Sequence, residues 1–211
     1  MAITNTTRDL GRTVLLCLVG GAADAIAYLR FGTFVGAMTG NTVLLGIDLA
    51  EGHGERAFYH VTIVAVFLIT VIGARLALER KMPVIVPLSL TALMLGLSGL
   101  IASQWGAVVS AAALGLQNAA VRNIGGVPIN TAFITGDLVN LGSAVPKAPQ
   151  AHHEIGVLAT AWIAYAAGAV LGAVALRALS FPMIVPAVLA LAAAIVEAIV
   201  ERRNAARRSD S

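Results

Sequence analysis

Two acidic side chains, Asp24 and Asp137, lie in segments that otherwise hold almost only apolar, small or hydroxyl-bearing residues. An intramembrane carboxylate costs about 2.5–3.5 kcal/mol on insertion scales, so such a residue usually faces the interior of a helix bundle. Protonation removes this cost, which makes both acids candidate proton carriers. For Asp137 a structural explanation stays open, because the helix dipole alone favours an acid in a first helical turn.

A Thr-Gly pair marks two irregular segments of the chain, as Thr39-Gly40-Asn41 in the first half and Thr135-Gly136-Asp137 in the second. In each segment an extended-looking piece precedes the pair and about ten helix-prone residues follow it. Ten helical residues span about 15 Å, which is half a bilayer. The two segments are therefore predicted to be half-helices that begin at Thr-Gly, where Thr39 or Asn41 and Thr135 are suitable N-cap residues.

Two half-helix N-termini that meet near the midplane of a membrane would form a site for a small polar solute, above all an anion or carboxylate. Their first-turn N–H groups have no intrahelical acceptor and carry partial positive charge. Glycine lets a ligand approach the backbone closely, which gives Gly40 and Gly136 a role in binding. The alternative is that Gly, Thr and Asn here only allow close packing and cap the half-helices.

The motifs recur in the same order in both halves of the chain. The segment Gly21-Ala22-Ala23-Asp24-Ala25 aligns with Gly115-Leu116-Gln117-Asn118-Ala119, and Pro83-Val84-Ile85-Val86-Pro87 aligns with Pro182-Met183-Ile184-Val185-Pro186. Asp24 thus has Asn118 as its repeat mate, and Asp137 has Asn41. By this alignment Gln117 and Asn118 face the same cavity as Asp24. We predict two repeats, residues 1–102 and 103–211, each built as helix, broken segment, helix, helix.

The composition is that of a membrane protein. Of the 211 residues, 58% are hydrophobic and 12% are charged, against about 45–50% and 25% in soluble domains. The mean hydropathy is +0.87. A soluble enzyme, a nucleic-acid-binding protein and a disordered chain are excluded on this basis, and the single Cys17 excludes an internal disulfide. The fold class predicted is an all-α polytopic membrane protein, with the lipid bilayer as partner, no nucleic acid and no cofactor.

Topology follows from the basic residues. Six runs almost free of charge are long enough for membrane-spanning helices, at 13–29, 57–78, 84–101, 105–121, 155–176 and 182–200. If the irregular segments 31–47 and 127–145 also cross, Lys and Arg divide almost evenly between the two sides. If they re-enter, all but Arg30, Arg56 and Arg177 of the 14 lysines and arginines lie on the side of the termini.

The positive-inside rule favours the re-entrant arrangement. It predicts six transmembrane helices plus two re-entrant half-helices, with the N- and C-termini cytoplasmic in a bacterial inner membrane. Because each half has three spans, the halves have opposite orientations, which is the inverted-repeat plan of many transporters. The small-residue face Gly168–Gly172 is expected to pack helices within the chain, and a homodimer stays open as an alternative.

Two short motifs raise the alternative of an intramembrane protease. Gly96-Leu97-Ser98-Gly99 and Ala151-His152 resemble motifs of rhomboid intramembrane proteases. Such a protease needs its serine and histidine in hydrogen-bond contact, whereas the expected topology separates Ser98 from His152. We therefore expect no enzymatic activity. We also expect no metal site, because no metal-ligand spacing relates the four histidines, His53, His60, His152 and His153.

The motifs together resemble a known family. Gly36-Ala37-Met38-Thr39-Gly40-Asn41-Thr42-Val43, Gly115-Leu116-Gln117-Asn118-Ala119 and Thr135-Gly136 are similar to segments of the YoaK-like family of bacterial inner-membrane proteins, a domain of unknown function. The resemblance covers nearly the whole chain. It implies a six-span inner-membrane protein and supplies no substrate.

The function expected is a small secondary carrier for a polar solute. Protons would be coupled through Asp24 and Asp137. A narrow channel of the same architecture and a non-transporting membrane sensor or interaction module are the alternatives. The residues expected to bind the solute are Thr39, Gly40, Asn41, Gln117, Asn118, Thr135 and Gly136.

Overall fold

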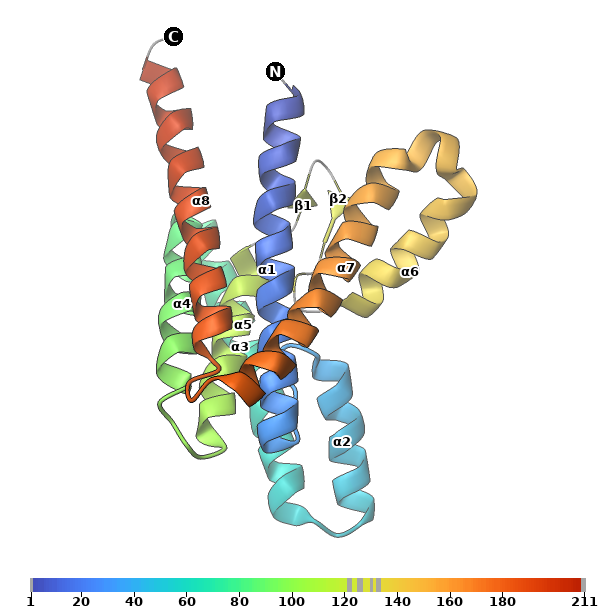
Figure 1. Ribbon diagram of the computed structural model, residues 1–211, viewed down its shortest axis with the longest axis vertical. Coiled ribbons are helices and arrows are strands. Elements are labelled where there is room, and N and C mark those ends of the chain that lie inside the picture. The colour runs from blue at the N-terminus through green and yellow to red at the C-terminus, as the bar shows by residue number, and fades with distance from the viewer. Residues whose placement is uncertain (1, 121–122, 125–126, 130, 132–133, 210–211) are drawn as a thin grey trace.

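The computed structural model describes residues 2–120, 123–124, 127–129, 131 and 134–209. Within these residues the chain is almost entirely helical (Figure 1). The helices are α1 Ala2–Phe31, α2 Met38–Ala50, α3 Gly54–Glu79, α4 Ile85–Ser98, α5 Trp105–Ala120, α6 Ile134–Ala144, the 3₁₀ turn η1 Val145–Lys147, α7 Ala148–Ala178 and α8 Ile184–Ser209. Two strands of two residues each, β1 Asn123–Ile124 and β2 Val127–Pro128, pair antiparallel between α5 and α6.

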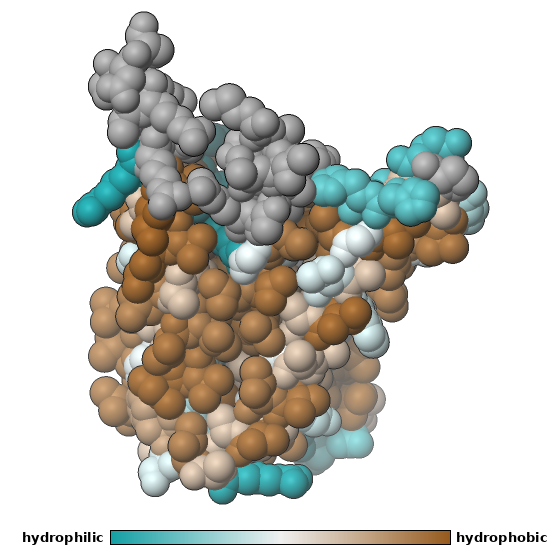
Figure 2. All heavy atoms as spheres, turned by 45° about the horizontal axis from the view of Figure 1, so that its top comes forward, coloured by the Kyte–Doolittle hydropathy of each residue, from teal (hydrophilic) through white to brown (hydrophobic). Residues whose placement is uncertain are grey.

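The described chain contains four helices that are long and apolar enough to cross a membrane, in α1, α3, α7 and α8. Helices α4 and α5 are apolar but shorter, with 14 and 16 residues. In α3 only 11% of the most hydrophobic window is buried inside the protein, and it exposes large apolar residues such as Leu68, Ile69 and Ile72. Figure 2 shows apolar side chains covering the body of the molecule on the side in view, with hydrophilic residues toward the ends.

Helices α1 and α7 cross at very close range because small residues line both. A Cβ added to Gly168 would lie 2.3 Å from the backbone oxygen of Leu18, and one added to Gly172 would lie 2.4 Å from that of Ala22. On the facing helix, a Cβ on Gly21 would lie 2.0 Å from the Tyr165 backbone oxygen. The prediction that the Gly168–Gly172 face packs within the chain is confirmed.

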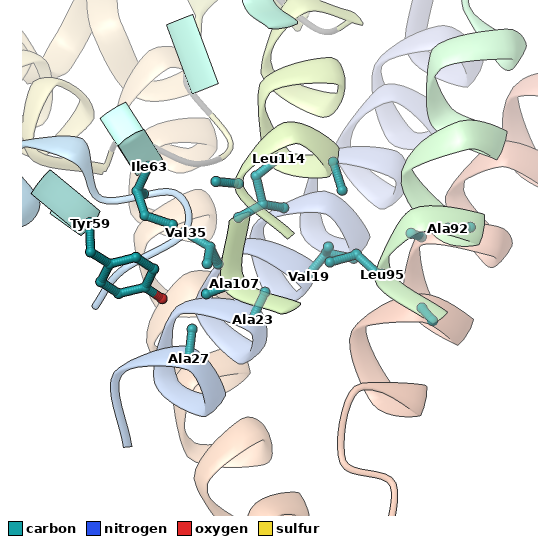
Figure 3. Packing of buried hydrophobic residues seen from close by; sticks show 14 residues of the cluster. Val19, Ala23, Ala27, Val35, Tyr59, Ile63, Ala92, Leu95, Ala107 and Leu114 are labelled. Atoms are coloured by element: carbon teal, nitrogen blue, oxygen red, sulfur yellow. The ribbon is translucent and has the colours of Figure 1, made fainter. Parts of the chain in front are cut away.

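The apolar core lies where α1, α3, α4 and α5 meet. Figure 3 shows Val19 and Ala23 of α1 beside Leu95 of α4 and Ala107 of α5, with Ile63 of α3 nearby. Alanine is frequent in this cluster, so neighbouring helices approach closely there, as is common in membrane bundles. Ala187 and Ala190 of α8 complete this cluster, and Met38 of α2 packs against it. A second cluster joins α1 to α7, and Ile134 and Leu141 of α6 pack against that one.

The two short helices take up a distinctive position. Figure 1 shows α2 and α6 each beginning near the middle of the molecule and running toward opposite ends, while the N- and C-termini lie at the same end. Helix α2 packs on α3, and α6 packs on α7. At 13 and 11 residues, each helix is about 16–20 Å long, which is well short of a bilayer core.

The start of α2 differs from the expectation. The helix begins at Met38, with Ala37 as N-cap and no side-chain cap hydrogen bond, so neither Thr39 nor Asn41 caps it. Asp24 on α1, distant in the chain, instead accepts the N–H groups of residues 35–37, the segment that leads into the helix.

Candidate functional site

The carboxylate of Asp24 organises the segment that leads into α2. Its Oδ1 accepts hydrogen bonds from the backbone N–H groups of Val35 and Gly36, both at 2.7 Å, and its Oδ2 accepts one from Ala37 at 3.1 Å. Oδ2 also accepts a hydrogen bond from the hydroxyl of Tyr165 on α7. Asp24 is 3% exposed, so these donors satisfy a charge that burial would otherwise make costly.

Asn41 fixes the same segment from its other side. Its Oδ1 accepts from the Phe34 N–H at 2.9 Å, and its Nδ2 donates to the Phe34 carbonyl at 2.7 Å. The Thr33 hydroxyl also donates to Oδ1, at 2.9 Å. Asn41 is fully buried, and its amide is used by the protein's own backbone. The sequence predicts that Asn41 binds solute, but in the structure its side chain holds the segment before α2 in place.

A cavity of about 420 Å³ lies where α2, α6 and α7 approach one another. This volume is within the range of about 300–1,000 Å³ that is usual for small-molecule sites. Three of the predicted residues, Thr39, Gly40 and Thr135, line it together. The other described lining residues are Ala37, Ile134, Leu138, Trp162, Tyr165, Ala166 and Ala169.

The described lining of this cavity is mainly apolar and carries a few uncharged polar groups. Thr39, Thr135 and Tyr165 bring hydroxyl groups, and Trp162 brings an indole, between apolar side chains. The N–H groups just before α2 are already bonded to Asp24. Another carboxylate, Asp137, is buried in the first turn of α6. Each short helix thus has an acid at its positive end, which offsets the dipole that would attract an anion.

Comparisons with known proteins agree with this architecture. A family model described as "Protein of unknown function (DUF1275)" matches residues 13–196. The chain belongs to the DUF1275 family. The chain is also 28% identical over 142 residues to the UPF0700 transmembrane protein YoaK of Bacillus subtilis, with 60% of this chain and 63% of that relative covered. No solved structure matches. This DUF1275 chain is an α-helical membrane protein, as its apolar helices and this relative indicate.

The remaining predicted residues are not among those that line the described cavity of this DUF1275 protein. Gln117 donates from Nε2 to the Leu16 carbonyl at 2.9 Å and to the Thr131 hydroxyl at 3.2 Å, which ties α5 to α1. The backbone carbonyl of Asn118 accepts from Arg75 at 3.3 Å. Gly136 and Asp137 lie in the first turn of α6 beside the cavity.

Sequence reasoning missed the α7 side of the site. Tyr165 and Trp162 line the cavity, yet both lie in a run of alanines that gives no motif. The sequence does distinguish them in one way, because they are large aromatic residues in the middle of a helix that is otherwise rich in small residues. Such residues could have been flagged as candidates to fill or line a gap.

Proposed function

We propose that this DUF1275 protein is a small membrane transporter that binds a small polar solute in the cavity between α2, α6 and α7. One observation carries the proposal: two short helices from different halves of the chain begin at one cavity, so that Thr39 and Thr135 line it together. Non-helical backbone at membrane depth is tolerated only where it is buried in protein or lines a polar cavity. Discontinuous helices of this kind form the substrate sites of many carriers.

Helix packing supports an inverted repeat of residues 1–102 and 103–211. If α1–α4 correspond to α5–α8, the pairing of α1 with α7 has its counterpart in α5 with α3. Likewise α2 on α3 corresponds to α6 on α7, and α4 on α5 to α8 on α1. A two-fold relation between the halves produces this set of contacts, and in an inverted repeat its axis lies in the membrane plane.

The path of the chain supports six spans with α2 and α6 as re-entrant half-helices. Both termini lie at one end of the molecule in Figure 1, and the two short helices run toward opposite ends. With this arrangement, most Lys and Arg lie on the side of the termini, which the positive-inside rule assigns to the cytoplasm. We therefore place both termini in the cytoplasm and the protein in the bacterial inner membrane.

The solute we propose is uncharged, in place of the anion that the half-helix dipoles alone would suggest. Asp24 and Asp137 stand at the positive ends of α2 and α6, and no Lys or Arg belongs to the described cavity lining. An anion there would lie near these two carboxylates, and like charges in a buried site repel each other. Hydroxyl and indole groups can instead exchange hydrogen bonds with a neutral polar molecule.

A thermal-shift screen in detergent tests the proposal, with panels of neutral solutes, small carboxylates, inorganic anions and cations. A ligand at 100 times its dissociation constant stabilises the folded state by about 2.7 kcal/mol. The solute that shifts unfolding is then tested for uptake and counterflow in proteoliposomes. Thr39→Val and Thr135→Val should weaken both binding and uptake. Thr42→Val is the matched control on α2, because its hydroxyl only bonds the Met38 carbonyl on the exposed side.

The outcomes separate the candidate functions. Saturable counterflow that requires Thr39 supports a carrier, whereas flux without counterflow indicates a channel. Binding without flux indicates a sensor. A shift with anions alone overturns the choice of a neutral solute, and no shift with any panel overturns the solute site itself.

A further inference from the structure

We propose that the turn between α2 and α3 binds a divalent transition-metal ion through Asp48, Glu51, His53 and His60. This site lies at the opposite end of α2 from the cavity and does not depend on the proposed transport function. One ligand atom each from Asp48, Glu51 and His53 lies within 4.8 Å of the other two. Carboxylate oxygens and imidazole nitrogens together suit Zn²⁺ and related ions.

Two of the distances among these atoms are close to those in a metal coordination shell. Nδ1 of His53 lies 3.2 Å from Oε2 of Glu51 and 3.6 Å from Oδ1 of Asp48. Four-coordinate zinc with bonds of about 2.0–2.2 Å places neighbouring ligand atoms about 3.3 Å apart. The backbone already brings the donors together, because Gly52 has a φ of 77° and the His53 N–H bonds back to the Asp48 carbonyl at 2.8 Å.

Hydrogen bonds around His60 fix which ring nitrogen carries the hydrogen. Asn41 Oδ1 accepts from the Phe34 N–H, so it also accepts from the Thr33 hydroxyl at 2.9 Å. Thr33 has then used its one hydrogen, and its oxygen must accept from Nδ1 of His60 at 3.3 Å. In the neutral ring the lone pair is therefore on Nε2.

That lone pair faces a carboxylate. Nε2 of His60 lies 3.2 Å from Oδ2 of Asp48, and both side chains belong to residues that are 2% exposed. Within the described part of the chain Oδ2 of Asp48 accepts no hydrogen bond, and in this tautomer the nitrogen beside it offers none. The lone pair of Nε2 and the carboxylate oxygen Oδ2 repel each other unless a cation lies between them. Metal-binding histidines commonly donate their other N–H to a second residue, which is the role of Thr33 here.

A proton on Nε2 is the competing cation, and Arg56 helps to distinguish it from a metal. Nε of Arg56 lies 3.4 Å from Oδ1 of Asp48, and its side chain is 62% exposed. The guanidinium can therefore move into solvent, but while in place it competes with a metal for Oδ1. Removing its charge should tighten metal binding, whereas a purely structural ion-pair cluster would only be weakened.

The experiment is a Zn²⁺ titration of the tag-free, full-length protein in detergent after chelator treatment. We expect about one zinc per chain by calorimetry and by elemental analysis after gel filtration. His53→Gln and Glu51→Gln should weaken binding at least about tenfold, Thr33→Val by about 10–100-fold, and Arg56→Gln should strengthen it. His152→Gln with His153→Gln, at the start of α7, is the matched control and should leave binding unchanged.

Several results would overturn the site. They are the absence of saturable zinc binding, unchanged binding in His53→Gln, or loss of binding in the His152 and His153 control. Binding of Mg²⁺ or Ca²⁺ without Zn²⁺ would also overturn it, because those ions prefer oxygen ligands alone. Substitution of the buried Asp48 could unfold the protein, so the test uses the half-exposed Glu51 and His53. X-ray absorption of the zinc complex should report imidazole ligands.

Discussion

The carboxylate of Asp24 on α1 accepts a hydrogen bond from the Tyr165 hydroxyl on α7, 141 residues away in the chain. The same carboxylate accepts three backbone N–H groups from the segment before α2. One side chain therefore links a long helix, the irregular segment and an aromatic residue of the cavity wall. Asp24, which the sequence predicts to be a proton carrier, thus also holds these three parts of the protein together.

Replacing Asp24 by Asn should destabilise the protein. An amide offers one acceptor oxygen where the carboxylate offers two, so the Ala37 N–H loses its acceptor, and hydrogen bonds to charged groups contribute about 1.5–3 kcal/mol. For a chain of this size this corresponds to a fall of about 3–12 °C in melting temperature. Thermal unfolding in detergent, followed by fluorescence, measures it.

Tyr165→Phe is the companion variant, because it removes one donor and leaves the three N–H groups bonded to Asp24. We expect a smaller fall in melting temperature than for Asp24→Asn. Equal melting temperatures for Asp24→Asn and the unaltered chain would contradict the anchoring role. Uptake that stays pH-dependent in a folded Asp24→Asn protein would remove Asp24 as the coupling residue.

The close crossing of α1 and α7 predicts a second contrast in stability. Gly168→Ala places a Cβ 2.3 Å from the Leu18 backbone oxygen, so the helices must separate, at a cost of about 1–3 kcal/mol or more. Gly156→Ala on the same helix meets nothing within 4 Å and should be neutral or stabilising by up to about 1 kcal/mol. Melting temperatures of the two variants check this. Similar losses in both would mean that helix propensity, and not the crossing, dominates.

The helices of this protein could be predicted more completely than its polar contacts. Apolar runs and prolines locate each long helix, although α1 begins 11 residues before and α8 ends nine residues after the predicted span, and Thr-Gly marks the region where each short helix begins. The backbone partners of Asp24 could not be predicted, because they depend on how the irregular segment 32–37 turns back against α1. The pairing of Asp48 with His60 escaped for a similar reason. The spacing of Asp48 and His60 in the sequence matches no metal motif. The turn at Gly52 is what brings His53 and Glu51 close to Asp48.

Filling the cavity should abolish solute binding without unfolding the protein. Ala166 lines the cavity, so Ala166→Leu occupies space that the solute needs. Ala167 is its exposed neighbour on α7, outside the described lining, and Ala167→Leu is the matched control. We expect the ligand-induced thermal shift and the uptake to disappear in Ala166→Leu and to persist in Ala167→Leu. Loss of uptake in both variants, or in neither, would contradict this location for the site.

Labelling of single cysteines distinguishes a re-entrant α2 from one that crosses the membrane. In a Cys17→Ser background, Arg30→Cys and Glu55→Cys flank α2, and Lys81→Cys follows α3. If α2 re-enters, an impermeant thiol reagent added to intact cells should label positions 30 and 55 and spare position 81. If α2 crosses, position 55 changes sides and is protected, whereas position 81 is labelled. Positions 30 and 55 on opposite sides would therefore remove the six-span plan, and with it the midplane meeting of Thr39 and Thr135.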